Sequence, residues 1–239
     1  MKVNCLSITF WFNIIDNENE VLKSLQEEFD DYNKYELFNK TDNLMQPIIT
    51  GVNNQEKTNL VVSQINLQYN MDNTSLKDEK KFKEKALKLY NILIKNNVKV
   101  LHTALFVNSE ITIDNPLKSL EKIINSSFNT SELVDISIKL SKCHEELFYK
   151  IVSLFNKKQV KMPKEVDDKG RFIPLPLISF NGSFVENEMI DISYEINDKY
   201  LYDFTKNYST TEFYLNKMLY LLFSDIESDI NNILEKGKF

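Results

Sequence analysis

Apolar residues recur along the chain with two different periods, and these periods predict the secondary structure. Between Leu6 and Ile14 the even positions are apolar, which is the pattern of a strand with one buried face. Apolar residues at helical spacing follow between Val21 and Tyr32, and again after a capping box formed by Ser75 and Asp78. Further strands are predicted over residues 44–52, 61–71 and 98–113.

The order of these elements is β-α-β-β-α-β. That order is typical of the ferredoxin-like arrangement, a four-stranded antiparallel sheet with both helices on one face. We therefore expect an α+β fold whose first half, residues 1–114, is ferredoxin-like.

The second half, residues 115–239, is predicted to be an antiparallel four-stranded sheet with a long C-terminal helix. Asn115-Pro116 is a strong helix start, and a short helix should follow it. Strands are predicted around residues 134–140, 148–155, 177–185 and 189–196. The closing helix, from Ser209 to Lys236, would be about 40 Å long at ~1.5 Å per residue.

A faint internal repeat accompanies these elements. Three strands end in an apolar or aromatic residue followed by an Asn/Asp cluster, at Phe12–Asp16, Tyr69–Asn73 and Tyr194–Asp198. Gene duplication would produce this repeat. The same residue types are also favoured wherever a strand turns into a helix, and we favour this second explanation.

Composition narrows the function mainly by exclusion. The chain has four Gly and two Cys, and it lacks the glycine-rich phosphate loops and the metal or nucleophile motifs of common enzymes. We assign no catalytic residue, no cofactor and no metal site, and an enzyme is not favoured. The net charge of −6 makes the whole chain a poor partner for nucleic acid.

Residue usage also suggests a setting. The chain has 28 Asn, and Arg171 is its single arginine, a bias typical of AT-rich coding in a low-GC bacterium or its phages. No apolar run reaches the length of a membrane-spanning helix, and two unpaired-looking cysteines fit a reducing compartment. We predict a cytoplasmic protein with no membrane partner.

The histidines are weak candidates for chemistry. His102 lies within a predicted strand, where a sheet-face histidine is favoured over a general base. His144 stands beside Cys143 and Glu145 in a predicted hairpin loop, where adjacent side chains diverge, so a metal site is not favoured.

Charge is segregated along the first half. Residues 16–42 carry nine acidic and three basic side chains, whereas residues 74–100 carry eight lysines and three acids. In the second segment a stripe at helical spacing is formed by Lys77, Lys81, Lys85 and Lys88. We favour a solvated helix face; the alternatives are a nucleic-acid contact, with His102 as a possible base, and self-association of complementary faces.

The C-terminal helix carries a broad apolar arc. Its aromatic residues Tyr214, Tyr220 and Phe223 are the kind of anchor found in protein interfaces. We predict a protein partner, or a homo-oligomer, bound through this helix.

The strand Val100–Ile111 and the segment Met189–Ser193 before the long helix resemble a sporadically distributed family of uncharacterised bacterial proteins. That family carries an Arg-Tyr-x-Asn-x-Ile strand in the first position, and Asn108 and Ile111 suit the pattern, although no arginine stands in this strand. The resemblance covers the order of elements and implies a two-part α+β fold without implying an activity.

Three functional hypotheses follow. The first is a non-enzymatic interaction protein, an accessory or regulatory component of a bacterial or phage defence, counter-defence or toxin-antitoxin system. The second is a nucleic-acid-binding or RNA-processing protein built on ferredoxin-like units, which the scarcity of arginine disfavours. The third is a small-molecule sensor with a site between the two halves.

Overall fold

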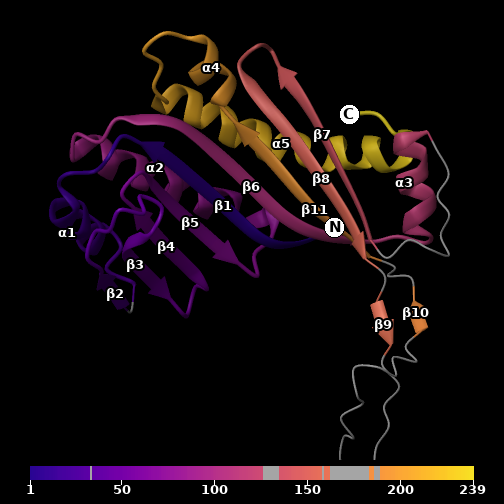
Figure 1. Cartoon of the computed structure of the whole chain (residues 1–239), viewed down its shortest axis with the longest axis horizontal. Helices are drawn as coiled ribbons and strands as arrows, with labels where there is room; N and C mark the ends of the chain where they lie inside the picture. The colour runs from indigo at the N-terminus through magenta and orange to yellow at the C-terminus, as the bar shows by residue number, and fades with distance from the viewer. Residues whose placement is uncertain (33, 126–134, 158, 162–182, 186–188) are drawn as a thin grey trace, which may run out of the picture.

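One large antiparallel sheet organises the chain. The computed structural model describes residues 1–239 except 33, 126–134, 158, 162–182 and 186–188. Nine strands pair in the order β2-β3-β4-β5-β1-β6-β11-β8-β7 (Figure 1). The strands are β1 Lys2–Phe12, β2 Lys34–Leu37, β3 Pro47–Asn53, β4 Thr58–Ser63, β5 Asn66–Asp72, β6 Val100–Thr112, β7 Asp135–His144, β8 Phe148–Lys157 and β11 Met189–Asn197. A separate two-stranded sheet pairs β9, Gln159–Lys161, with β10, Ser183–Val185.

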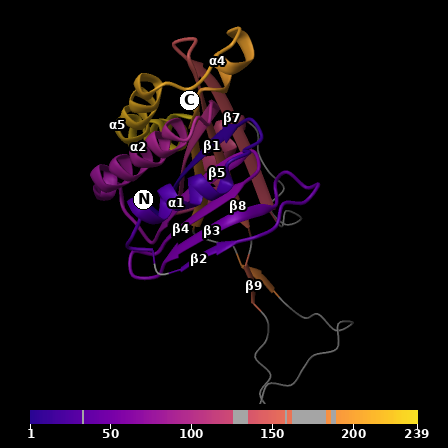
Figure 2. The same ribbon diagram turned by 90° about the vertical axis from the view of Figure 1, so that its left-hand side faces the viewer.

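The long helices pack on one face of the sheet. Helices α1, α2 and α5 lie on the same side of it, and α3 packs against α5 (Figure 2). None of the described helices is long and apolar enough to cross a membrane. The bounds are α1 Glu18–Glu28, a 3-10 turn η1 Leu76–Asp78, α2 Glu79–Lys95, α3 Pro116–Ile124, α4 Lys199–Phe204 and α5 Glu212–Lys236.

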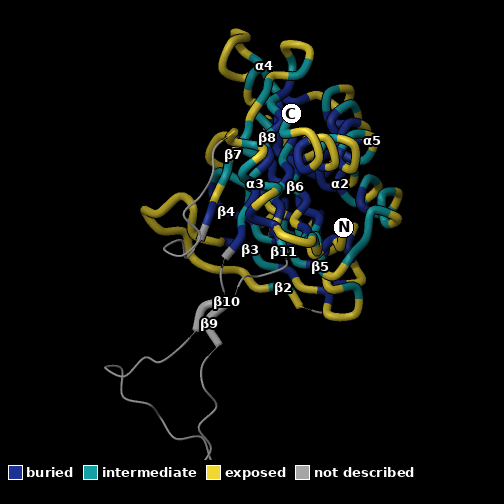
Figure 3. Tube along the Cα trace, turned by 90° about the vertical axis from the view of Figure 1, so that its right-hand side faces the viewer, coloured by how far each residue is buried: buried dark blue, intermediate teal, exposed yellow. Residues whose placement is uncertain are grey.

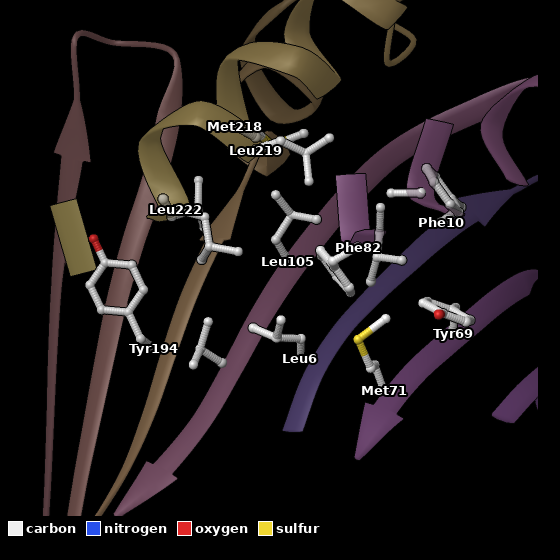
Figure 4. Packing of buried hydrophobic residues seen from close by; sticks show 14 of the residues in the cluster. Leu6, Phe10, Tyr69, Met71, Phe82, Leu105, Tyr194, Met218, Leu219 and Leu222 are labelled. Carbon is white, nitrogen blue, oxygen red and sulfur yellow. The ribbon is translucent and has the colours of Figure 1, made fainter. Parts of the chain in front are cut away.

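Apolar side chains at alternate positions of β1 form part of the core between the sheet and the helices. Leu6, Ile8 and Phe10 are fully buried, and Phe10 packs against Tyr90 of α2 with 6.3 Å between ring centroids. Figure 4 shows Leu6, Phe10 and Phe82 among the residues of this core. Figure 3 shows buried residues concentrated between sheet and helices. Burying a side chain of this size contributes about 1.5–3 kcal/mol, so each of these residues stabilises the packing of sheet and helices.

The order of strands is nearly symmetric about the β1–β6 pair. Outward from this pair, β5 matches β11, β4 matches β8, and β3 matches β7. Each half also runs from a central strand through a helix and antiparallel strands to a helix that covers the sheet. The echoed segments Tyr69–Asn73 and Tyr194–Asp198 fall at matching places, at the ends of β5 and β11.

The α+β class, the large antiparallel sheet and the C-terminal helix are confirmed, but the four-stranded sheets are wrong. The sheet has nine strands because β6 pairs with β1 on one side and with β11 on the other. The strands of residues 1–114 and those of residues 115–239 are therefore hydrogen-bonded into one sheet. Of the strand expected over 177–185, residues 177–182 lie outside the described residues, and β10 covers the rest.

The strand expected over 61–71 is in fact two strands joined by a turn. Ser63 makes this turn, because its Oγ accepts hydrogen bonds from the backbone N–H groups of Ile65 and Asn66. Leu60 and Val62 are therefore the buried apolar residues of β4, at even positions, whereas the buried residues of β5 stand at odd positions.

A buried ionic cluster fastens α5 to the sheet. The Lys150 side chain of β8 is 2% exposed, and its Nζ lies 2.5 Å from Asp225 Oδ2 and 3.2 Å from Asp229 Oδ2. Tyr194 OH donates to Asp229 Oδ2 at 2.6 Å, and Lys142 pairs with the same carboxylate at 3.1 Å. Burial acts to raise the pKa of Asp229, but the hydrogen bonds from Tyr194 and Lys142 and the charge of Lys150 outweigh it and lower that pKa.

Removing the central cation of this cluster should destabilise the protein strongly. We expect Lys150→Met to lower the free energy of unfolding by about 3–5 kcal/mol, because two partly buried carboxylates lose their shared cation. Denaturant unfolding measures the change. The matched variant Lys206→Met, at an exposed position, should change the stability by less than about 0.5 kcal/mol. Equal effects of the two variants would contradict this assignment.

Candidate binding surface

The predicted lysine stripe faces the acidic segment of the same chain. Lys81 pairs with Glu56 at 2.8 Å, Lys85 with Asp31 at 3.2 Å, and Lys88 with Glu28 at 3.4 Å. The ammonium groups of Lys85 and Lys88 also lie over the ring of Phe29, at 4.8 and 5.4 Å from its centroid. Lys77 lies in η1 and is exposed. Three of the four stripe lysines thus pair with carboxylates of the same chain, two of them with acids of residues 16–42.

The predicted interface residues of α5 divide between the interior and the surface. Phe223 packs edge-on to Phe82 at 6.2 Å between ring centroids, and Tyr214 packs against Phe148 at the same separation. Tyr220 is 64% exposed, and Phe213, one heptad earlier, is 70% exposed. Two of the three predicted anchors therefore contribute to internal packing, and one points to solvent.

His102 lies on the face of the sheet opposite the helices. Its ring stacks on Trp11 with 4.4 Å between centroids, and Tyr202 of α4 lies 5.4 Å away. Burial, followed by the nearby Lys199 charge, lowers the pKa of His102 to about 4, although Asp203 acts in the opposite direction. The imidazole is therefore neutral at neutral pH, and its buried Nδ1 has no hydrogen-bond partner among the described residues.

A buried carboxylate holds the segment after β11 beside this histidine. Asp198 accepts hydrogen bonds from the backbone N–H of Thr103 at 2.6 Å, from Thr210 Oγ1 at 2.6 Å and from Tyr208 OH at 2.8 Å. Burial raises the pKa of Asp198 despite these donors. The contacts tie the starts of α4 and α5 to β6, so one end of the sheet face has a fixed shape.

Of the described helices, the sheet face opposite α1, α2 and α5 carries only the short α4, whose Tyr202 and Tyr200 lie against His102 and Tyr149 at one end. We call this sheet face the open face, and Figure 2 shows the side of the sheet that is turned away from α1, α2 and α5. Strand register assigns its residues, because side chains alternate between the two faces of a sheet. Its central members are Cys5, Ser7, Thr9 and Trp11 of β1; Asn66, Gln68, Asn70 and Asp72 of β5; His102, Ala104, Phe106, Asn108 and Glu110 of β6; Asp191, Ser193, Glu195 and Asn197 of β11; and Tyr149, Ile151, Ser153 and Phe155 of β8.

Negative charge dominates the centre of the open face. Strands β5, β1, β6 and β11 carry four carboxylates, Asp72, Glu110, Asp191 and Glu195, and a single lysine, Lys2, which pairs with Glu110. Burial raises the pKa of Glu195, although a hydrogen bond from Asn197 and the charges of Lys139 and Lys199 act in the opposite direction. The remaining residues are mostly amides, hydroxyls and partly exposed aromatic rings. Such a surface attracts cations and repels phosphates.

Cys5 does not offer a reactive group on this face. Burial and the neighbouring Asp72 carboxylate raise the pKa of the Cys5 thiol to about 12. The thiolate is the nucleophilic form of cysteine, so Cys5 is a thiol with little reactivity at neutral pH. Within the described ranges, no group of three His, Cys, Asp or Glu side chains is arranged to hold a metal ion.

A shallow hollow of about 310 Å³ lies on the open face over β6, β11 and β8. Its lining includes Asp191, Ser193, Asn108, Ser153 and Phe155. In the sequence these residues carry no sign of a shared site, because each is only a member of the polar or mixed face of an amphipathic strand. Strand order was the missing information, since it places segments far apart in the chain side by side.

Comparison with known proteins adds no family. No family model matches the chain, and no curated protein matches it. Among solved structures, the chain is similar to "Methanococcus jannaschii TBP", with 10% sequence identity, 95% of this chain and 98% of that chain covered, and a TM-score of 0.27. A similarity at this TM-score supports no statement about the function of this chain.

Protonation of His102 should weaken folding at acidic pH. Its folded pKa of about 4 lies below the ordinary value of 6.5, so between these values the unfolded chain binds more protons and stability falls as the pH falls. His102→Gln removes this titration, and the stability of the original protein relative to this variant should therefore decrease from pH 7 towards pH 4. Denaturant unfolding across that range measures the difference. A pH-independent difference would show that His102 is not held in its neutral form.

Proposed function

We propose that this chain is a non-enzymatic interaction protein that binds a positively charged polypeptide segment on the open face of its sheet. The observation that carries the proposal is the set of four carboxylates on β5, β6 and β11, on a sheet face that α1, α2 and α5 leave uncovered. Electrostatic complementarity of this kind selects partners and accelerates their association.

The side-chain chemistry of the open face also suits a polypeptide. Its amides, among them Gln68, Asn70 and Asn108, both donate and accept hydrogen bonds, as backbone peptide groups do. Between them lie partly exposed apolar groups, including Phe106 and Ile151, which are able to bury area against a partner. A mixture of apolar anchors and hydrogen-bonding groups is the usual anatomy of a protein interface.

Two observations favour the open face over the surfaces expected from the sequence. The lysines Lys81, Lys85 and Lys88 are paired within the chain, which weakens the alternative of a nucleic-acid contact. Tyr214 and Phe223 pack internally, so α5 keeps fewer free anchors than its sequence suggests. An accessory role in a bacterial or phage defence, counter-defence or toxin-antitoxin system remains part of this proposal and rests on composition.

Peptide arrays of graded charge test the proposal. We expect binding to strengthen with positive peptide charge, and the amide variant Asp72→Asn/Glu110→Gln/Asp191→Asn/Glu195→Gln to weaken it by at least about tenfold, or about 1.4 kcal/mol. The matched control Glu84→Gln/Glu212→Gln/Glu227→Gln/Glu235→Gln removes the same charge from exposed positions on the helices and should bind as the original protein does. Preference for anionic peptides, or equal losses in both variants, would refute the proposal.

Nucleic acid provides the contrasting measurement. We expect little retention of labelled single-stranded or double-stranded RNA and DNA in filter binding at low salt, because open-face carboxylates repel phosphates and three of the four stripe lysines are paired within the chain. Salt-dependent binding that is abolished by Lys81→Glu/Lys85→Glu would instead support the nucleic-acid alternative.

A further inference from the structure

We propose that the hollow over β6, β11 and β8 receives one lysine or arginine side chain of the partner polypeptide, with Asp191 as its counter-ion. This inference rests on the proposed function and deepens it. It names the position on the open face at which the partner is anchored and the chemical group that is recognised there.

Strand register arranges the hollow as two adjacent rows across three strands. In the first row Asp191 lies between Glu110 of β6 and Phe155 of β8. In the second, Ser193 lies between Asn108 and Ser153. The first row thus consists of two carboxylates followed by an aromatic ring, and the second row consists of neutral hydrogen-bonding groups.

The two carboxylates create a local demand for a cation. Asp191 and Glu110 face one another across an antiparallel pair, and like charges in that position destabilise a sheet. Lys2 pairs with Glu110, whereas Asp191 is exposed and has no cationic partner among the described residues. A positive group between the facing carboxylates would relieve their repulsion, and an incoming side chain is able to supply it.

The other wall of the hollow matches the remainder of a long basic side chain. The ring of Phe155 provides an apolar surface for the methylene stem and a π face for the cation, which favours ammonium and guanidinium groups. Ser193, Ser153 and Asn108 offer oxygen acceptors for the donors of the head group.

The size of the hollow agrees with a single side chain. Its volume of about 310 Å³ stands at the lower limit of pockets that hold whole small-molecule ligands, about 300–1,000 Å³. One lysine or arginine side chain with accompanying water fits this space. The chain to which that side chain belongs then extends over the adjoining open face, where the amides of β1, β5 and β6 lie.

A backbone-amide NMR titration of the full chain tests the assignment. The probes are N-acetyl-lysine-N-methylamide and N-acetyl-arginine-N-methylamide, with the uncharged N-acetyl-norleucine-N-methylamide as their control. We expect saturable shifts confined to the neighbourhood of Asn108, Ser153, Asp191 and Ser193 with the basic probes, and none with norleucine. Equal shifts with norleucine, with calcium chloride, or around Asp72 and Glu195 instead of Asp191 would overturn the inference.

Variants separate the inference from the proposed function. Asp191→Asn should lower the affinity for the basic probes at least about fivefold, and Phe155→Leu should lower it less. Glu227→Gln on α5 should leave this affinity unchanged. If Asp191→Asn binds cationic peptides as tightly as the original protein while the four-carboxylate variant does not, the anchor assignment fails and the proposed function stands. If cationic peptides do not bind the original protein, the proposed function itself fails.

Discussion

The antiparallel pairing of β1 with β6 is the constraint on which the rest of the structure depends. These two strands form the centre of the sheet and join its two halves through a register that places Ile8 opposite Leu105 and Ser7 opposite Phe106. Because side chains alternate between the two faces from Cys5 to Trp11, between the two irregularities of this pair, the register also decides which residues face the helices. A slip by one residue would move the buried set to the solvent side, and nine strands would lose a common core face.

Charge pairing on the helix layer has a consequence for the opposite face. The acids of residues 16–42 and the lysines of α2 lie against one another, as the contacts of Asp31 with Lys85 and Glu28 with Lys88 show. Each such surface pair contributes less than about 1 kcal/mol, so these pairs add little to stability. Their larger effect is to neutralise much of this helical surface, whereas the carboxylates of the central strands have one lysine among them.

Local signals in the sequence predicted where helical segments begin to within a few residues; the long helix was expected from Ser209 and starts at Glu212. Ser75 and Asp78 form the expected capping box, Asn115 caps α3 with Pro116 at its first position, and the long helix begins after Thr211. These predictions succeeded because caps depend on residues only a few positions apart. The turn at Ser63 was missed because the apolar positions on its two sides read as one interrupted strand, although Ser-Gln-Ile-Asn is itself a local turn sequence. The four-residue β2 carries too short a pattern to stand out from a loop.

The proposed site was beyond sequence reasoning for a different physical reason. Glu110, Asp191 and Phe155 lie on three strands, and they become neighbours only because β11 inserts between β6 and β8. Each residue alone resembles an ordinary solvent-facing position on an amphipathic strand. The conflict between two facing carboxylates appears only when the register is known, and folding tolerates it because the β1–β6 core fixes that register from the other side of the sheet. A sheet face whose residues contribute little to the core tolerates such a repulsion between carboxylates. A cationic group of the proposed partner would relieve it.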